Sequence, residues 1–419
     1  MILTYSFDIQ YNNKLNELFL NSKNLYNQAL YEIKQSLKND KFLFYNDLNK
    51  LMMNKINLDG NINYKLLKAQ VSQQILMNLD KNVKSYFKSI KDWSKNKSKY
   101  KSMPKLPNYK KDKNLLIYTN QCSSIKNNII NLSKDIKIKL PLNKSIKYDF
   151  NNYKQIRLIP NNKYITIEII YDKQIIKNNN LDENRYLSID LGINNLMSCI
   201  TDNEQPFIIN GKQIKSINQF YNKQKQKLTS IKDKQKIKGY TKKLYELEHK
   251  RSKRIKDILH KISKYIIDYC IKKGIKNIVV GYNKQWKQSI NLGNKTNQTF
   301  VSIPFQKLIN NLLYKSELND MNMIMNEESY TSKCDSLALE SVSKQTEYKG
   351  KRIKRGLFLS SIGKIINADI NGSLNILRKY LIKTNVVNKF SYIKKIIDSG
   401  LLFNQIKLNN IYNLKLNNI

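Results

Sequence analysis

The sequence predicts a mixed α/β protein of two parts, and three observations lead to this class. Apolar residues recur at three- and four-residue steps over 15–33 and 71–90, which is the spacing of amphipathic helices. Between 115 and 171, short stretches alternate apolar and polar residues, as half-buried strands do. From 186 onward, strand-like segments are followed by alternating helical and strand patterns, which indicates an α/β domain.

The composition is that of a folded protein from a reducing compartment. With 419 residues, 41% of them hydrophobic, the chain can form two or three domains with cores. No segment approaches the roughly 18 uninterrupted apolar residues of a membrane helix, and the N-terminal MILTYSFDIQ lacks the basic region of a secretory signal. Four scattered cysteines without a CxxC pair argue against a disulfide framework, so we expect a cytoplasmic protein.

The charge balance predicts a polyanionic partner. There are 75 Lys and Arg residues against 32 Asp and Glu residues, a formal net charge of +43. Neutralising phosphates with such a surplus releases counterions and favours binding. Nucleic acid is therefore the expected partner, and a membrane surface is not.

The N-terminal part begins with a predicted strand over 2–9, followed by the two helices. The second helix leads into the basic stretch KDWSKNKSKYKSMPKLPNYKKDKN, in which lysines are interleaved with Trp93, Tyr100 and Tyr109. Such a mixture is typical of surfaces that track a nucleic-acid backbone. Lys105, Tyr109 and Lys110 are the candidate contacts, and a solvated linker between domains is the alternative.

The alternating stretches that follow include IKIKLPL and YITIEIIY, which predict a small antiparallel barrel or sandwich. The charged loop KNNNLDENR at 177–185 then marks a domain boundary.

After this boundary, YLSIDLGINN, LMSCIT and PFIIN read as three strands in a meander. A long lysine-rich helical hairpin, broken near Gly239 and ended by Gly274, comes next. A strand over 277–280, a helix over about 304–319, the strand MNMIM and a helix beginning NADINGSLNILRKY complete the pattern. This order of elements resembles an RNase H-like α/β fold.

Three acidic positions lie at the ends of these elements: Asp190 in the first strand, Glu327 or Glu328 after a later strand, and Asp369 at the start of the last helix. Each alone is explained by a turn or a helix cap. Together they suit phosphodiester hydrolysis, in which carboxylates hold two divalent ions about 4 Å apart. Hard oxygen ligands select Mg²⁺ or Mn²⁺. The glycine after Asp190 is expected to admit a phosphate backbone.

The sequence offers little support for a histidine-based catalytic site or a P-loop nucleotide site. The only histidines, His249 and His260, lie on lysine-rich helix, and no GxxxxGK[ST] motif occurs. Arginine is rare and suits bidentate phosphate contacts, although chance placement explains its positions equally well. The candidate contacts in the C-terminal part are Arg251, Arg254, Arg378 and, in the basic loop 350–356, Lys351, Arg352 and Arg355.

Four motifs carry a family resemblance. In residues and in order, four segments are similar to the TnpB (OrfB) proteins of bacterial insertion sequences, which are relatives of type V CRISPR effectors. The segments are IDLGINN, RIKDILHKIS, EESYTSKC and INADINGSLNILRK. Three N-terminal segments also resemble that family's recognition and wedge segments: LYNQALY, VSQQILMNLDKNVKSYFKSIKD and KSMPKLPNYK. The resemblance therefore covers nearly the whole chain.

The resemblance implies a domain plan. A wedge β-barrel would comprise 1–10 and 112–180, with a helical recognition bundle and basic linker at 11–111 inserted in it. A RuvC-like nuclease domain would span 181–384, and 385–419 would be a C-terminal tail.

It also implies an RNA-guided DNA endonuclease of the bacterial nucleoid. Such a protein holds a guide RNA transcribed from the transposon end and recognises double-stranded DNA beside a short target-adjacent motif. It cuts with one Mg²⁺-dependent site, in which Asp190 would be the first acid and Asp369 the last. A transposase encoded by the same element is a further expected partner.

The sequence departs from the family in two places. Gly281 stands where the middle glutamate usually follows the strand at 277–280, whereas Glu328 fits an alternative ExxTS pattern, with Glu327 as its neighbour. The zinc ribbon is also missing, because Cys334 is followed by no Cys or His over 335–366. We therefore predict no zinc and a basic segment in its place.

These departures leave alternatives open. A nuclease-inactive, RNA-guided DNA-binding repressor is favoured by Gly281, whereas the presence of Asp190 and Asp369 argues against it. A strict DNA transposase is compatible with the same acids. A basic RNA-binding protein without catalytic activity is the simplest alternative.

Overall fold

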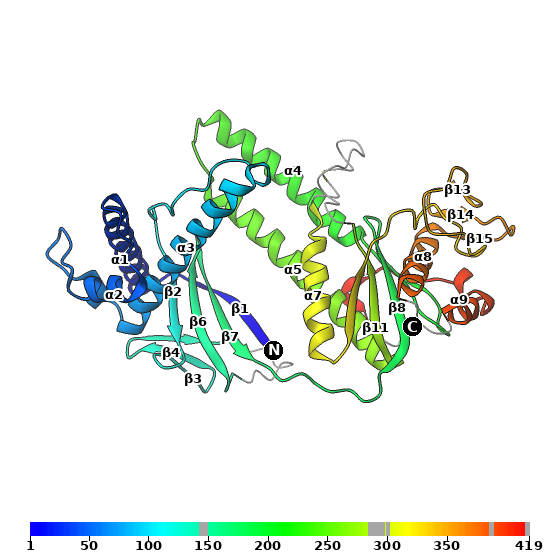
Figure 1. The fold of residues 1–419 in the computed structure, drawn as a ribbon, viewed down its shortest axis with the longest axis horizontal. Helices are drawn as coiled ribbons and strands as arrows, with labels where there is room; N and C mark the ends of the chain where they lie inside the picture. The colour runs from blue at the N-terminus through cyan, green and yellow to red at the C-terminus, as the bar shows by residue number, and fades with distance from the viewer. Residues whose placement is uncertain (142–149, 284–297, 299–301, 385–388, 415–419) are drawn as a thin grey trace. The chain divides into compact units, whose positions relative to one another are not determined.

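The computed structural model describes residues 1–141, 150–283, 298, 302–384 and 389–414. The chain divides into two compact units, Met1–Gln174 and Ile175–Ile419, drawn in Figure 1. The first residues of the second unit are attached to it by the backbone N–H of Ile176, which donates to the carbonyl of Leu318 at 2.9 Å. The division therefore falls a few residues before the predicted boundary at 180/181.

The helices of the first unit form where apolar residues repeat with helical spacing. The side chain of Asn12 caps the first helix by accepting a hydrogen bond from the backbone N–H of Leu15 at 2.8 Å. Both predicted helices are present, and a short third one between them was not predicted. They are α1 (Asn13–Lys38), α2 (Tyr45–Asn54) and α3 (Ala69–Lys95), with 3₁₀ turns at Asn63–Leu66 and Lys97–Lys99.

The strands of the first unit form two antiparallel sheets in the described part of the chain, where the sequence suggested a small antiparallel barrel or sandwich. The larger sheet has the order β1-β7-β6-β2, and its alternating isoleucines at 165, 167 and 169 are fully buried in the same core as the helices. Its strands are β1 (Ile2–Gln10), β2 (Leu116–Thr119), β6 (Tyr153–Pro160) and β7 (Tyr164–Asp172). The smaller sheet contains β3 (Ser124–Lys126), β4 (Ile129–Ser133) and β5 (Ile136–Lys139).

The second unit is organised around a six-stranded mixed sheet of order β12-β11-β8-β9-β10-β16. As predicted, the first three strands form an antiparallel meander, and the later strands β11 and β12 run parallel to β8. The strands are β8 (Asp182–Leu191), β9 (Asn195–Ile200), β10 (Phe207–Asn210), β11 (Ile275–Gly281), β12 (Asn322–Asn326) and β16 (Ile406–Leu408).

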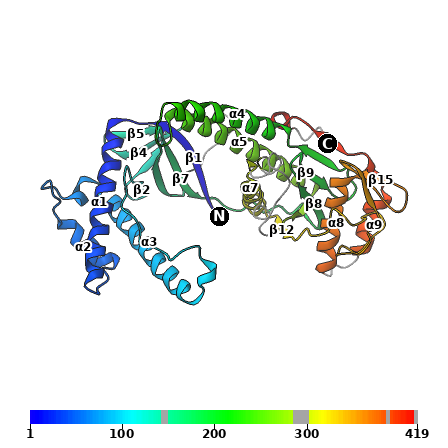
Figure 2. The same cartoon turned by 90° about the horizontal axis from the view of Figure 1, so that it is seen from above.

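Helices cover both faces of this sheet, as Figures 1 and 2 show. Leu187 and Ile189 pack into a core with α5 and α7, whereas Tyr186 and Val279 pack on the opposite face with α8. Gly274, with φ of 65°, ends α5 in the left-handed conformation that favours glycine. The helices are α4 (Lys212–Lys234), α5 (Lys242–Lys273), α7 (Phe305–Leu318), α8 (Ala368–Lys383) and α9 (Lys389–Asp398).

The predicted C-terminal tail is part of the second unit. Strand β16 pairs in parallel with β10, and Leu402 and Ile411 are buried within the same unit. Short 3₁₀ turns lie at Leu401–Phe403 and Ile411–Asn413. The described residues of the expected C-terminal tail at 385–419 therefore belong to the second unit, because isoleucines and leucines among them are buried in its two cores.

Between β12 and α8, a small antiparallel sheet occupies the predicted basic segment. It consists of β13 (Lys351–Lys354), β14 (Leu357–Leu359) and β15 (Ile365–Asn367). In the described part of the chain, none of the helices has the length and apolar character needed to cross a membrane.

Candidate active site

Asp190 lies at the carboxyl end of β8 and faces α8. Side chains alternate along a strand, so Asp190 shares its face with Ser188. The Ser188 hydroxyl donates to the carbonyl of Ser373 in α8 at 2.7 Å, and the Ser373 hydroxyl donates back to the Ser188 carbonyl at 3.1 Å. This reciprocal pair fixes α8 against the strand that carries Asp190.

Gly372 permits this close packing of α8 on β8. A Cβ atom at position 372 would lie 2.8 Å from Oδ2 of Asp190, closer than Cβ atoms approach other heavy atoms. Glycine inside a helix costs roughly 1 kcal/mol relative to alanine. The close approach of the Asp190 carboxylate gives a reason for glycine at this position.

Asp369 stands in the first turn of α8 but does not cap it. The cap is Asn367, whose side chain accepts from the backbone N–H groups of Asp369 and Ile370 at 2.9 and 3.3 Å. Oδ2 of Asp369 instead accepts a hydrogen bond from Nδ2 of Asn195 at 2.6 Å. Because Asp369 precedes Gly372 by three residues, it lies on the face of α8 that Asp190 contacts.

Glu328 follows β12 and extends toward the end of β11. A Cβ atom built on Gly281 would lie 2.7 Å from Oε2 of Glu328 and would also collide with Ile376 of α8. The neighbouring strand β8 pairs Ile189 with Val280, so Gly281 is next to Asp190 in the sheet. The carboxylate of Glu328 thus fills the space left by the missing side chain at 281.

Glu327 has a different environment from Glu328. It is largely exposed, forms an ion pair with Lys379, and accepts a hydrogen bond from the backbone N–H of Ser329 at 2.9 Å. Burial opposes its ionisation, but the hydrogen bonds from Lys379 and Ser329 outweigh that effect and lower its pKa. Its carboxylate is therefore already paired.

The surroundings of Asp190 and Glu328 disfavour the charged form of both carboxyl groups. Burial raises the pKa of Asp190 well above its usual value, and the charges of Glu328 and Asp369 raise it further, while Arg352 opposes them. Burial, followed by the charge of Glu327, raises the pKa of Glu328 to about 7, and Lys379 opposes this rise. A cation between these groups would relieve both effects.

The oxygen atoms of Asp190, Glu328 and Asp369 are suitable ligands for a hard divalent cation. Within the part of the chain that the structure describes, the buried Oε2 of Glu328 has no hydrogen-bond partner, while Oε1 accepts from Asn283 at 3.3 Å. Asp190 and Asp369 supply further carboxylate oxygens, the ligands that Mg²⁺ and Mn²⁺ prefer. Among the described residues, however, no three Asp, Glu, His or Cys side chains are already gathered closely enough to hold a metal.

The glycine turn after Asp190 has an intramolecular explanation. A Cβ at Gly192 would lie 2.5 Å from the carbonyl oxygen of Asn195. Closing the turn between β8 and β9 requires glycine at 192, whether or not a phosphate approaches. The turn also brings Asn195 to Asp369.

The basic stretch after α3 is fastened to α1. Asn27 accepts from the backbone N–H of Lys110 at 2.7 Å and donates to its carbonyl at 2.9 Å. Lys105, Tyr109 and Lys110 remain exposed, with the Lys34 ammonium 4.1 Å from the centroid of the Tyr109 ring. The stretch is therefore an anchored, exposed surface rather than a free linker.

The candidate arginines differ in accessibility. Arg254, Lys351, Arg352 and Arg355 have exposed side chains that can reach a ligand. Arg251 is half-buried and donates to Asn218 at 2.7 Å and to the Ser302 carbonyl at 3.0 Å. Its guanidinium also lies 4.8 Å from the centroid of the Tyr221 ring, so much of its bonding capacity is used within the unit.

Arg378 requires a correction. The sequence suggested a nucleic-acid contact, but its side chain is only 4% exposed. Its guanidinium donates to Oδ1 of Asn375 at 2.6 Å and to the carbonyl of Glu340 at 2.8 Å. Burial lowers its pKa to about 10, opposed by nearby acidic groups. Arg378 therefore serves a structural role.

Arg378 belongs to a buried polar cluster that holds the segment 335–366, for which we predicted a basic segment in place of a zinc ribbon. Oδ2 of Asp335 accepts from the hydroxyl of Ser360 and the backbone N–H of Ser361, both at 2.7 Å. Oε2 of Glu340 accepts from the backbone N–H of Asp335 at 2.6 Å. This cluster of Asp335, Glu340 and Arg378 joins the basic sheet to α8.

Sequence reasoning missed Asn195, Gly372 and the buried cluster. A glycine within the otherwise helical INADINGSLNILRK was the available signal for a close contact at 372. No local pattern distinguishes Asp335 from an exposed loop residue, since its partners lie 25 residues away or more in three of the contacts.

Comparisons with known proteins agree with this architecture. Residues 168–287 match the OrfB_IS605 family, described as a probable transposase; this segment includes Asp190 but neither Glu328 nor Asp369. No curated protein matches the chain in sequence.

One solved structure has a similar fold, and two others match more weakly. A Cas12f1–sgRNA–target DNA complex matches with a TM-score of 0.55 and 16% identity, covering 87% of this chain and 83% of that one. A CRISPR-Cas12f ternary complex matches with a TM-score of 0.35 and 14% identity, over 87% and 82% of the two chains. The mini-RNA-guided endonuclease CRISPR-Cas_phi3 matches with a TM-score of 0.34 and 13% identity, over 54% and 52%.

Proposed function

We propose that the chain is a TnpB-like member of the OrfB family and an RNA-guided DNA endonuclease of a transposable element. Its substrate is double-stranded DNA beside a target-adjacent motif, and its guide is an RNA from the transposon end. The net charge of +43 supports a nucleic-acid partner.

The placement of Glu328 is the observation that carries this proposal. A nuclease of this family needs a middle acid, and Gly281 cannot supply one. Glu328 brings a carboxylate into the space beside Gly281, where its charge raises the pKa of Asp190. An inactive protein has no need to retain three acids at one end of a sheet, against the electrostatic cost that their proximity imposes.

Asp190, Glu328 and Asp369 would hold the metal ions. Bound Mg²⁺ or Mn²⁺ would activate water and stabilise the leaving oxygen of the cleaved phosphodiester. Asn195 orients the Asp369 carboxylate through its 2.6 Å hydrogen bond, and Lys379 keeps Glu327 paired outside the group. Arg352, whose charge lowers the pKa of Asp190, supplies positive potential that attracts the DNA phosphate.

One observation favours the repressor as a second candidate. The three acids are not gathered as a ready metal site among the described residues. A protein that binds DNA through its guide but cannot cut would show the same fold and charge. The two candidates differ only in cleavage.

The proposal is tested with protein co-expressed with the flanking transposon-end RNA. The purified complex is incubated with a plasmid library in Mg²⁺ or in EDTA, beside the Asp190→Ala variant. We expect a co-purifying RNA and cuts at guide-matched sites in Mg²⁺ alone, lost in Asp190→Ala. Guide-dependent binding without cuts would support the repressor, and Mg²⁺-dependent strand joining without guide dependence would support a strict transposase.

A further inference from the structure

Asn283 faces Glu328 just beyond the ends of β11 and β12. These strands pair in parallel, with Gly281 opposite Asn326 as the last pair. The backbone N–H of Tyr282 then donates to the carbonyl of Asn326 at 2.8 Å, so the contact between the two segments continues past the strands. The same register brings Asn283 opposite Glu328.

Asn283 contacts Glu328 through both atoms of its carboxamide. Nδ2 donates to Oε1 of the Glu328 carboxylate at 3.3 Å, and Oδ1 accepts from the Glu328 backbone N–H at 3.4 Å. A carboxamide can form this pair of contacts because it carries a donor and an acceptor side by side. One residue therefore restrains both the backbone and the end of the glutamate side chain.

The turn after Glu328 restrains its backbone from the other side. The hydroxyl of Thr331 donates to the Glu328 carbonyl at 2.8 Å, and the backbone N–H of Thr331 donates to the same carbonyl at 3.3 Å. Nδ2 of Asn375 in α8 donates to the carbonyl of Thr331 at 2.8 Å. The turn is thus fastened to the helix that carries Asp369, whereas the Glu328 carboxylate itself is contacted by Asn283.

The two oxygens of the Glu328 carboxylate differ in a way that suits a ligand. Oε1 accepts from Asn283, whereas Oε2 is buried beside Gly281 and has no hydrogen-bond partner among the described residues. A hydrogen bond to one oxygen orients a carboxylate and leaves its other oxygen available to a metal. Gly281 is next to Asp190 in the sheet, so the available oxygen lies on the side of the other acids.

We propose that Asn283 is a positioning residue, which holds the Glu328 carboxylate so that Oε2 is presented to a metal shared with Asp190 and Asp369. The inference deepens the proposed function and rests on it, because the metal belongs to the proposed nuclease site. Asn195 holds Asp369 in the same manner. Two of the three acids are therefore oriented by asparagines that lie outside the acidic group.

The test is the dissociation constant for Mn²⁺, measured on the full-length protein without nucleic acid from the electron paramagnetic resonance signal of free Mn²⁺. The loss of binding in Asp190→Ala identifies the site. We expect Asn283→Ala to bind Mn²⁺ about 10-fold more weakly than the wild type. This is the lower end of the roughly 10- to 100-fold effect of such residues, because both hydrogen bonds of Asn283 are long.

A double-variant comparison separates positioning from a general structural role. If Asn283 acts through the Glu328 carboxylate, adding Asn283→Ala to Glu328→Gln should weaken Mn²⁺ binding no further than Glu328→Gln alone. A residue that merely supported the fold would cause the same loss in both backgrounds. Circular dichroism and thermal unfolding verify that each variant is folded.

Asn322→Ala is the matched control. Nδ2 of Asn322 donates to Oδ1 of Asn277 at 3.0 Å, which is also a contact between an asparagine of the β12 segment and one of the β11 segment. It lies at the opposite end of the two strands from the acids. Asn322→Ala should therefore bind Mn²⁺ like the wild type.

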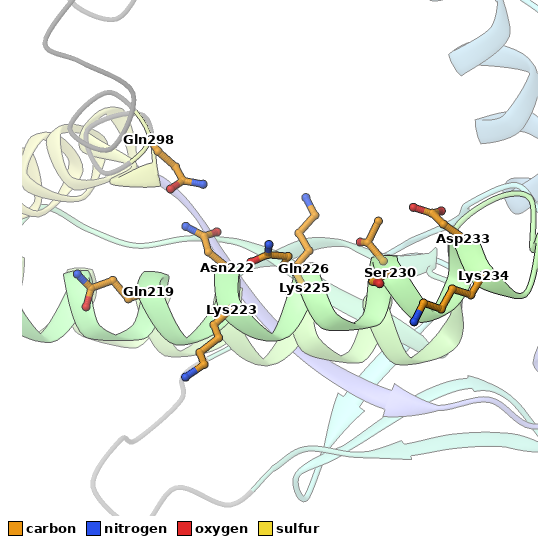
Figure 3. Close-up of a pocket in the computed structure, with 10 residues that line it drawn as sticks. Gln219, Asn222, Lys223, Lys225, Gln226, Ser230, Asp233, Lys234 and Gln298 are labelled. Atoms are coloured by element: carbon orange, nitrogen blue, oxygen red, sulfur yellow. The ribbon is translucent and has the colours of Figure 1, made fainter.

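Asp233→Asn controls for Mn²⁺ bound to a carboxylate elsewhere. Asp233 lines an open hollow of about 1320 Å³ along α4, drawn in Figure 3, and carries the only carboxylate among the lining residues that the structure describes. Its Oδ1 lies 3.5 Å from the ammonium of Lys232. Because a cation already neutralises this acid, Asp233→Asn should leave the Mn²⁺ affinity unchanged.

Three results would overturn the proposal: wild-type Mn²⁺ affinity in Asn283→Ala, an equal loss in Asn322→Ala, or a further loss when Asn283→Ala is added to Glu328→Gln. A wild type without a Mn²⁺ site that Asp190→Ala removes would overturn it together with the metal site of the proposed nuclease. The expected order of affinities in a protein that does not cut guide-matched DNA would instead contradict the nuclease alone and support the role of Asn283.

Discussion

The Glu328 carboxylate occupies the space that a side chain on Gly281 would need, with Oε2 2.7 Å from the position of such a Cβ. Two residues 47 positions apart in the sequence are thus complementary in space. One lacks a side chain at the end of β11, and the other supplies a carboxylate there from beyond β12. The catalytic account depends on this relationship.

The two adjacent glutamates are predicted to differ in function. Glu328→Gln should lower the cleavage rate at least about 100-fold, because a neutral amide cannot replace a metal-binding carboxylate. Glu327→Gln removes only an exposed ion pair with Lys379, and such pairs contribute little. Cleavage by this matched control should stay within about threefold of the wild type. Single-turnover cleavage rates distinguish the two, and a reversed order would assign the role to Glu327.

Gly372→Ala is predicted to impair cleavage more than stability. The added Cβ would meet Oδ2 of Asp190 at 2.8 Å, so the carboxylate must rotate or α8 must shift. A displacement of about 1 Å can reduce the rate about 100-fold. Lys383→Ala, at the exposed end of the same helix, is the control and should cut normally. Wild-type cleavage by Gly372→Ala would mean that the position of Asp190 tolerates this change.

The segment at 335–366 is predicted to fold without metal. Excess EDTA should leave the thermal unfolding midpoint unchanged, because hydrogen bonds to the buried Asp335 hold this segment. Asp335→Asn should lower the free energy of unfolding by about 2–4 kcal/mol, since it places an amide opposite buried donors. Glu347→Gln, exposed in the same segment, is the control. A lower midpoint in EDTA would contradict the prediction.

Lys315 gives a predicted pH dependence of stability. Burial, and then the charge of Lys264, lower its pKa to about 8 from a usual value of 10.5, while its ammonium donates to the His260 carbonyl and to Ser263. Below pH 8 both folded and unfolded states are protonated, so the folded state bears the full cost of the buried charge. Between pH 8 and 10.5 the folded state loses this proton first, and the contribution of Lys315 to stability rises.

Urea unfolding of the wild type and Lys315→Met measures this contribution. A pKa difference of one unit corresponds to about 1.4 kcal/mol, and the partial exposure of Lys315 reduces the effect. The stability of the wild type relative to the variant should therefore increase by about 1–2 kcal/mol between pH 7.5 and 10. Lys307→Met, exposed on the same helix, should show no such change. A pH-independent difference for Lys315→Met would contradict the lowered pKa.

Periodicity predicted the elements whose cores depend on local patterns. The apolar face of α8 and the meander that begins with β8 were predicted because their buried residues repeat with the period of a helix or strand. Helix α2 was missed because its ten residues bury only Leu48 and Met52, too few to establish a period.

The parts that were not predicted depend on contacts between distant segments. Arg378 is buried with its guanidinium donating to the backbone carbonyls of Asp335 and Glu340 and to the side chain of Asn375. No local sequence pattern indicates that an arginine has such partners. The sequence favoured Glu328 through its ExxTS pattern and kept Glu327 as the alternative. Their different environments arise only when Gly281 and Lys379 are brought to either side of them.

Moving the acid from position 328 to position 281 tests whether Glu328 supplies the middle carboxylate of the site. Guide-dependent plasmid cleavage is measured for Glu328→Ala, for Glu328→Ala with Ile376→Val, and for that pair with Gly281→Glu. Valine removes the Cδ1 atom that would collide with a side chain at 281. We predict that Glu328→Ala loses cleavage at least about 100-fold and that adding Gly281→Glu restores it at least about 10-fold. Wild-type cleavage by Glu328→Ala would show that Glu328 is not needed for catalysis.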